Sequence, residues 1–249
     1  MVNESLVCPD TYPLFSADQA YVPWAFEQAH QVFPDDTLLM INEVMHVSHK
    51  PVEENAYLKQ VKTLLAAGAG IEGIGFQFHF FSRQELDKHF PGNPVYRPGN
   101  LLNVYERFSE LGLPLYITEI TIPGSGDNGP AIQAEVVEYL YRIWFSIKGM
   151  AGITWWNLVD KTAYGNEGQA LGGLVDETLQ PKPAYQALDR LINQEWKTEY
   201  TGKTDADGRL VFRGFAGNYQ IKATAADDME YASPLQIVEG KENAVTYVL

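Results

Sequence analysis

Over the first 196 residues, short runs of β-branched and aromatic residues alternate with longer segments of helical periodicity. The short runs are apolar on both faces, which is typical of buried parallel strands, and they lie at residues 37–43, 73–80, 115–122 and 152–158. The longer segments repeat apolar residues every three or four positions and predict helices at residues 17–33, 53–67, 100–111, 132–147 and 181–192. This order of elements predicts an α/β fold in which helices cover a parallel sheet.

Polar and amphipathic residues gather where each predicted strand ends. They follow four strands and comprise Asn42 and Glu43, Gln77 and His79, Glu119, and Trp156 and Asn157. In an α/β barrel the carboxyl ends of the strands form the mouth of the active site, whereas a doubly wound sheet places its site at one or two switch points. Because four strands carry such residues at their ends, the pattern favours the barrel.

The pattern changes at about residue 198. Residues 201–225 and 234–249 contain short apolar stretches separated by turn residues, with no helical stripe. We therefore expect two domains: residues 1–196, which form the barrel part, and residues 197–249, which form a small β-sandwich-like antiparallel domain. Residues 205–208 (DADG) predict a hairpin turn; half of a calcium loop is the alternative, which is disfavoured because the run of ligands stops there.

Charge and composition narrow the range of partners. The chain has 18 Lys and Arg against 32 Asp and Glu, a formal net charge of −14, so its surface repels a nucleic acid and a neutral polymer or a small molecule is the expected partner. No apolar run approaches the roughly 18 residues that a membrane helix needs. The single cysteine, Cys8, excludes an intramolecular disulfide framework and a cysteine-rich metal site.

Several of the polar residues are candidates for chemistry. Glu119 lies in a run of β-branched and aromatic residues, where a carboxylate is costly to bury without a partner, so it has a function or it caps the sheet. Asn3 and Glu4 show a similar order of apolar residue, amide and carboxylate, although their position alone favours an unstructured terminus. Gln77 and His79 share one face of a strand, so they point into a mouth or form a satisfied polar pair in the core.

Trp155 and Trp156 end the last predicted strand, where an indole packs in the core or offers a stacking surface for a sugar ring. Two carboxylates on separate strand ends, surrounded by an amide, an imidazole and an indole, suit glycoside hydrolysis. One carboxyl group donates a proton to the leaving oxygen, and the other attacks or stabilises the anomeric centre. This chemistry needs no metal and no organic cofactor, and its partner is a polysaccharide.

Five motifs carry a resemblance to a known family. They are VNE (2–4), GIGFQFH (73–79), ITEITI (117–122), GITWWNLVD (152–160) and PKPAY (181–185). In order and spacing, over about residues 2–193, they resemble glycoside hydrolase family 10, the endo-β-1,4-xylanases. The resemblance implies a retaining TIM-barrel enzyme with two catalytic glutamates, Glu4 as general acid/base at the end of the fourth strand and Glu119 as nucleophile at the end of the seventh.

The resemblance also implies roles for the residues around this pair. Asn3 would hold the 2-hydroxyl of the sugar in the −1 subsite, and Trp156 would form a wall of that subsite. His79 would hydrogen-bond the nucleophile, and Gln77 would lie near the acid/base. Asn42 matches the asparagine that opens the family's Asn-Asp-Tyr motif on the fifth strand.

The chain departs from the family pattern at three places. Thr121 stands where the family often has an aspartate, two residues after the nucleophile. The Asn-Asp-Tyr motif continues here as Glu43 and Val44, and Tyr164 replaces a second tryptophan beyond the last strand. These departures concern the substrate more than the reaction, so we expect xylan or a related β-glycan.

The spacing of the motifs implies an incomplete barrel. The site residues recur about every 38 residues, so the chain supplies strands four to eight of a TIM barrel. Three preceding units, about 115 residues at this spacing, would close eight strands and build the subsites on the glycone side. We therefore expect a partial barrel with weak or no activity of its own.

Two other functions are left open by the sequence. One is a non-catalytic glycan-binding module that uses the aromatic mouth and the β-domain for adhesion. The other is a retaining β-glycosidase of a different barrel family, against which the GIGFQFH and PKPAY motifs argue. The composition is compatible with an extracellular or periplasmic parent protein.

Overall fold

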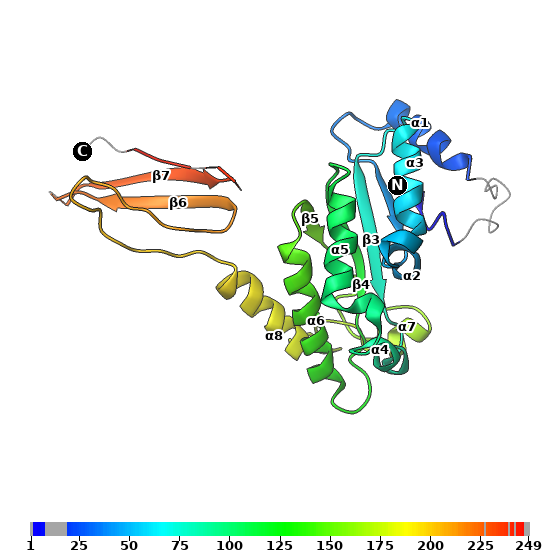
Figure 1. Ribbon diagram of the computed structural model, residues 1–249. Coiled ribbons are helices and arrows are strands. Elements are labelled where there is room, and N and C mark those ends of the chain that lie inside the picture. Colours follow the sequence, from blue (N-terminus) through cyan, green and yellow to red (C-terminus); the bar gives the residue numbers. More distant parts are fainter. Residues whose placement is uncertain (1, 8–18, 227, 239, 242, 247–249) are drawn as a thin grey trace. The chain divides into compact units, whose positions relative to one another are not determined.

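The computed structural model describes residues 2–7, 19–226, 228–238, 240–241 and 243–246 (Figure 1). The chain divides into two compact units, Met1–Leu188 and Asp189–Leu249, and each unit is described by itself. Within the described residues no helix is long and apolar enough to cross a membrane.

The first unit is built on a parallel sheet with the strand order β1-β2-β3-β4-β5. Its strands are β1 (Val2–Asn3), β2 (Met40–Glu43), β3 (Gly73–His79), β4 (Leu115–Thr121) and β5 (Met150–Ile153). Each strand pairs with the next one along the chain. Because parallel neighbours run in the same direction, all five carboxyl ends meet at one edge of the sheet.

Helices join the strands, as parallel pairing requires, and further helical segments follow β5 (Figure 1). They are α1 (Tyr21–Val32), α2 (Met45–Ser48), α3 (Ala56–Ala66), α4 (Arg83–His89), α5 (Pro98–Ser109), α6 (Gly129–Ser146), α7 (Asn166–Gln169) and α8 (Pro183–Arg190), with short turns η1 (Val52–Glu54), η2 (Pro94–Tyr96) and η3 (Leu191–Glu195). Local chemistry defines several of their starts. The side chain of Asn55 accepts the N–H of Leu58 at the start of α3, and Ser82 accepts that of Glu85 at the start of α4.

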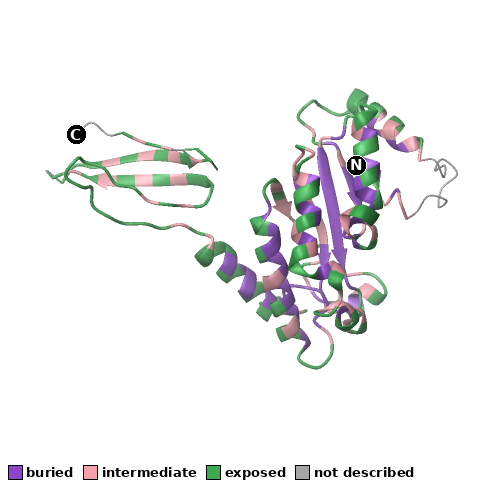
Figure 2. Cartoon of the chain, in the orientation of Figure 1, coloured by how far each residue is buried: buried purple, intermediate pink, exposed green. Residues whose placement is uncertain are grey.

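The core of the first unit lies between β3 and helices α5 and α6. Strand β3 is buried along its whole length, as Figure 2 shows. Phe78 packs edge to face on Trp144 of α6, with ring centroids 5.3 Å apart, and Phe76 packs on aromatic rings of α5. Because side chains alternate along a strand, Gln77 and His79 point to the opposite face, away from this aromatic layer.

The expected α/β class, with a parallel sheet and a separate antiparallel pair, is confirmed. The predicted helix at residues 17–33 begins at Tyr21, and positions 17 and 18 lie outside the described residues. The prediction that Trp156 ends the last strand is wrong, because β5 ends at Ile153. Beyond that point the chain still follows β4 irregularly, since the N–H groups of Thr154 and Trp156 donate to the carbonyls of Ile117 and Ile120.

The second unit contains one antiparallel pair, β6 (Gly217–Thr224) and β7 (Glu230–Ile237). Side chains along both strands alternate between exposed and half-buried, which is the pattern of a sheet with one face turned to water. A separate turn forms earlier in this unit. There the N–H of Gly208 donates to the carbonyl of Asp205, and the N–H of Asp205 donates to that of Arg209.

Candidate active site

The first candidate carboxylate, Glu4, follows directly after β1. Asn3 lies opposite Asn42 in the register of β1 and β2, and the N–H of Glu4 donates to the carbonyl of Asn42 at 3.0 Å. Glu4 has φ of 56°, in the left-handed region that costs a non-glycine residue roughly 1–3 kcal/mol when the surroundings impose it. The chain therefore turns sharply at Glu4, at the end where the neighbouring strands carry their polar residues.

The amide of Asn42 links the two candidate carboxylate regions. Asn42 is fully buried, and its Nδ2 donates to Oδ1 of Asn3 at 2.7 Å and to Oε1 of Glu119 at 3.1 Å. Its Oδ1 accepts a hydrogen bond from the Thr118 hydroxyl at 2.7 Å. Because all these partners are in place, the orientation of the amide is determined and the amide holds β1 and β4 residues together across β2 and β3.

The side chain of Gln77 is the second amide of the cluster. Its Nε2 donates to Oε1 of Glu4 at 2.9 Å and to Oδ1 of Asn3 at 3.2 Å. The Nδ2 of Asn3 donates to the same Oε1 of Glu4 at 3.1 Å. One hydrogen bond therefore joins Glu4 to Gln77, a residue of the buried strand β3.

The second candidate carboxylate, Glu119, is held at both oxygens. Its Oε1 accepts from Asn42, and its Oε2 lies 3.3 Å from Nε2 of His79. The side chains of His79 and Glu119 are 10% and 13% exposed, so this contact is largely shielded from water. The other ring nitrogen of His79, Nδ1, lies 2.9 Å from the hydroxyl of Thr121.

A β-bulge in β4 brings these groups to one face. Phe76 pairs with Ile117, whereas Gln77 pairs with Glu119, so Thr118 is an extra residue on β4. Strict alternation would turn Thr118 and Glu119 to opposite faces. With the bulge, both side chains reach the amide of Asn42.

Two aromatic rings flank His79. Phe81 stacks on it with ring centroids 5.1 Å apart, and Trp156 meets it at 6.1 Å with an interplanar angle of 76°. Trp156 is 50% exposed, so part of its indole is accessible to a ligand. The indole of Trp155 is instead hydrogen-bonded within the protein, because its Nε1 donates to the carbonyl of Gly172 at 3.0 Å. Tyr164 is 98% exposed, and no hydrogen bond or ring contact joins it to the described residues of this cluster.

Glu43 is a buried carboxyl group next to the cluster. Its oxygens accept the N–H groups of Leu6, at 2.7 Å, and Val44, at 3.0 Å. The pKa of Glu43 is raised to about 7, mainly because burial disfavours its charged form; the two hydrogen bonds lower the pKa, and the charge of Glu4 adds to the increase.

Three residues of the network were not singled out by the sequence for this role. Thr118 orients Asn42, and its only sequence signal is its place beside Glu119. Thr121 stands where the family often has an aspartate, and its hydroxyl donates to Oε1 of Glu167 at 3.0 Å. Glu167 lies on α7 in a loop without periodicity, and its Oε1 also accepts from Asn157 Nδ2 at 2.9 Å.

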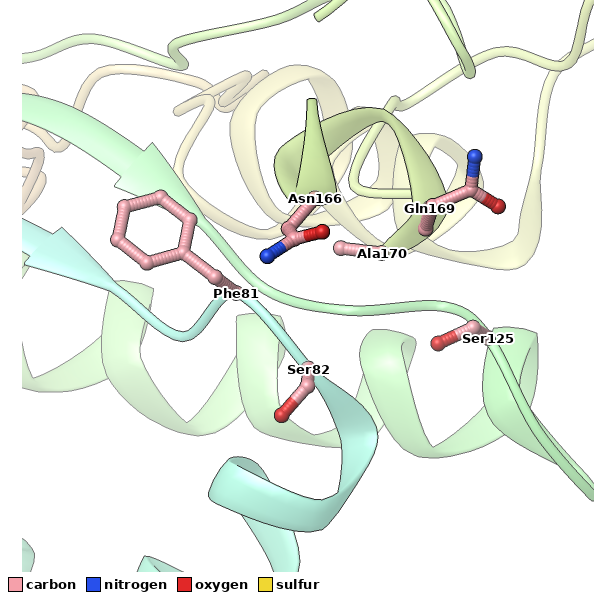
Figure 3. A pocket seen from close by; sticks show the side chains of 6 residues that line it. All are labelled: Phe81, Ser82, Ser125, Asn166, Gln169 and Ala170. Atoms are coloured by element: carbon pink, nitrogen blue, oxygen red, sulfur yellow. The ribbon is translucent and has the colours of Figure 1, made fainter. Parts of the chain in front are cut away.

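A pocket of about 370 Å³ lies beside the network, at the lower end of the size range of small-molecule sites. It is lined by Phe81, Ser82, Ser125, Asn166, Gln169 and Ala170 (Figure 3). In Figure 3, Asn166 and Ala170 lie across the pocket from Ser82, and Phe81 closes one end. The pocket thus adjoins His79 through Phe81, which stacks on it, and Glu167 through the preceding residue, Asn166. Neither candidate carboxylate lines the pocket.

Among the described residues, no group of three or more His, Cys, Asp and Glu is placed to hold a metal ion.

The family is shown by comparison with known proteins. The model for glycosyl hydrolase family 10 matches residues 14–190, and the chain belongs to this family. The resemblance expected from the sequence motifs is therefore confirmed.

The chain is similar to two xylanases and to an anti-sigma factor. Endo-1,4-beta-xylanase B of Thermotoga neapolitana is 30% identical over 71% of this chain and 49% of that protein. Anti-sigma-I factor RsgI6 of Acetivibrio thermocellus is 27% identical over 88% of this chain and 26% of that protein. Native xylanase 10B of Thermotoga maritima superimposes with a TM-score of 0.61 and 27% identity, over 78% of this chain and 59% of that one. The chain thus spans less than half of the two curated relatives and 59% of the solved xylanase.

Gly75 of β3 leaves the space that the Asn42 amide fills. A Cβ at position 75 would collide with Oδ1 of Asn42 and lie 2.9 Å from Cγ2 of Thr118. We predict that Gly75→Ala lowers the free energy of unfolding by about 1–3 kcal/mol, because the buried amide has no free direction to move in. Urea unfolding followed by fluorescence measures this.

Gly73→Ala on the same strand is the matched control. Its Cβ would meet the flexible end of Leu38 at 3.1 Å, so it should cost much less. Equal losses for the two variants would show that Asn42 is not confined as described.

Glu43 predicts a pH dependence of stability. The pKa of Glu43 is raised from 4.5 to about 7 in the folded chain, so its contribution is fully present below pH 4.5 and is lost as pH rises through 7. The stability of the wild type relative to Glu43→Gln should therefore fall between pH 4.5 and 7.5, by on the order of 2 kcal/mol. The part of the difference that is the same at every pH reports the altered hydrogen bonds to Leu6 and Val44. A difference that is the same at pH 4.5 and pH 7.5 would contradict the raised pKa.

Proposed function

We propose that this chain carries the catalytic pair of a retaining glycoside hydrolase that acts on β-1,4-xylan or a related β-glycan. The observation that carries the proposal is the hydrogen-bonded cluster in which the Asn42 amide joins Asn3, next to Glu4, to Glu119. Retaining hydrolysis requires a pair of carboxyl groups close to each other, and these hydrogen bonds bring Glu4 and Glu119 into one cluster. The xylanase relatives and a xylanase 10B of Thermotoga petrophila solved with xylobiose support the class of substrate.

In the first step of the proposed reaction, Glu119 attacks the anomeric carbon of the bound sugar. Its oxygens are both held, by Asn42 and by His79, so the carboxylate is oriented before substrate arrives. The protonated carboxyl of Glu4 donates its proton to the leaving glycosidic oxygen as that bond breaks. The products are a glycosyl ester on Glu119, a free sugar end, and an ionised Glu4.

In the second step, the Glu4 carboxylate removes a proton from water, and the water oxygen attacks the anomeric carbon. The ester bond to Glu119 breaks, which restores both groups and keeps the original anomeric configuration. Asn3 lies beside Glu4 and is exposed, so it is available to hold a sugar hydroxyl. Trp156 supplies a half-exposed ring on which the sugar can stack, and the exposed ring of Tyr164 is a second surface that we propose contacts the substrate.

We infer that the isolated chain hydrolyses xylan only weakly. In the described residues β1 has two residues and pairs on one side only, with β2, so Glu4 is carried by an edge strand. Part of the wall that would bind the non-reducing side of the substrate is therefore not supplied by these five strands. The alternative of a non-catalytic glycan-binding module is not favoured, because binding alone does not require a pair of aligned carboxylates.

The two proposed roles predict different losses on different substrates. Glu119→Gln should lower kcat/KM by roughly 10³-fold or more on both xylan and 4-nitrophenyl β-xylobioside, because both need the nucleophile. Glu4→Gln should lower kcat/KM by roughly 10²-fold or more on xylan and much less on the nitrophenyl substrate, whose leaving group needs no proton. Reducing-end and nitrophenolate assays measure these ratios.

Glu177→Gln is the control, because it removes a carboxylate that pairs with Lys161 at the surface. It should leave both rates unchanged. The proposal is contradicted if the wild type does not turn over the nitrophenyl substrate, or if the variant of Glu119 retains the wild-type rate.

A further inference from the structure

A relay of three side chains runs from His79 away from the candidate nucleophile. Nδ1 of His79 lies 2.9 Å from the Thr121 hydroxyl, and that hydroxyl donates to Oε1 of Glu167 at 3.0 Å. His79 and Thr121 are buried, at 9% and 2% exposure, and Glu167 is half-buried. The relay joins β3, β4 and α7, three elements that are far apart in the sequence.

Counting protons gives the relay a direction. A threonine hydroxyl has one proton, and here it is donated to Glu167. The Thr121 oxygen can then only accept from Nδ1 of His79, so Nδ1 carries hydrogen. Two carboxylates face the imidazole, Glu119 directly at Nε2 and Glu167 through Thr121 at Nδ1.

Glu167 is itself held from a second side. Nδ2 of Asn157 donates to the same Oε1 at 2.9 Å, from the segment that follows β5. Oε1 of Glu167 thus accepts two hydrogen bonds, which fixes the direction of its carboxyl group. The position of α7 is thereby coupled to the ring of His79.

We propose that Glu167 is a positioning residue, which acts through Thr121 to fix the protonation and orientation of His79 against Glu119. This inference rests on the proposed function only in naming Glu119 as the nucleophile. Without the Glu167 carboxylate, the Thr121 hydroxyl is free to donate to Nδ1, so Nδ1 becomes an acceptor and the imidazole keeps hydrogen only on Nε2, beside Glu119. The chain thus obtains from a loop the carboxylate that β4 lacks at position 121.

The test reads the ring directly by ¹⁵N NMR of the 249-residue chain, with the His79 signal assigned by its loss in His79→Asn. In the wild type we expect hydrogen on both ring nitrogens of His79, because Nε2 faces Glu119 and Nδ1 faces Glu167 through Thr121. Glu167→Ala should remove the hydrogen from Nδ1 and leave the one on Nε2, and Thr121→Val should also remove the Nδ1 signature while leaving Glu167 in place. In the double variant the rate loss should equal that of either single variant, because both break the same relay.

Rates on 4-nitrophenyl β-xylobioside supply the second readout. Glu167→Ala should lower kcat by about 10-fold to 100-fold, the scale expected when a reacting group is misplaced, with KM changed by less than threefold. Thr121→Asp in the Glu167→Ala background should recover most of this loss, because its carboxylate would replace the hydroxyl beside Nδ1. Glu177→Ala, another carboxylate beyond β5, is the control and should change neither the NMR signal nor the rate.

The outcomes separate the two proposals. If the wild type shows no turnover but Glu167→Ala changes the His79 signal, the relay stands and the proposed function fails. If the wild type is active and Glu167→Ala leaves both the His79 signal and kcat unchanged, the positioning role of Glu167 is overturned. A loss of stability without a change at His79 would likewise assign Glu167 a structural role only.

Discussion

The structure of the site depends on one buried amide. Asn42 donates to Asn3 and to Glu119 and accepts from Thr118, so a single side chain on β2 connects three strands. An amide buried without these partners would cost several kcal/mol, which means that the cluster forms as a whole or not at all. Gly75 leaves the space for the amide, and the bulge in β4 places the Thr118 hydroxyl where it donates to the amide oxygen.

The candidate nucleophile and the candidate acid/base are held by different parts of the sheet. Glu119 lies within a central strand, is 13% exposed and has both oxygens in contact with neighbours. Glu4 follows an edge strand of two residues, where amide groups from Asn3 and Gln77 orient its Oε1. A carboxyl group whose oxygen is oriented in this way is placed to exchange protons with a leaving oxygen and then with water.

Much of this arrangement could be predicted from the sequence. Apolar runs located β2, β3 and β4, and alternation along β3 placed Gln77 and His79 on one face. The end of β5 could not be predicted, because the chain after Ile153 still bonds to β4 while its spacing becomes irregular, so the apolar run extends past the strand.

Contacts that depend on irregular geometry were also beyond the sequence pattern. The bulge at Thr118 breaks the period of two on which the strand prediction rests. Glu167 lies in a short helix within a loop, and only the folded chain brings it to Thr121. The family motifs predicted the groups that we propose to meet the substrate, whereas the residues that orient those groups are seen only in hydrogen bonds between distant segments.

The central claim is that Glu119 forms a covalent bond to the sugar during the reaction. A 2-deoxy-2-fluoro xylobioside with a dinitrophenyl leaving group slows the second step more than the first, so the intermediate accumulates. Mass spectrometry of the intact chain and of its peptides should then show one added fluoro-xylobiosyl group, located on Glu119. Labelling of another residue, or release of dinitrophenol by the active chain without any covalent adduct, would contradict the account.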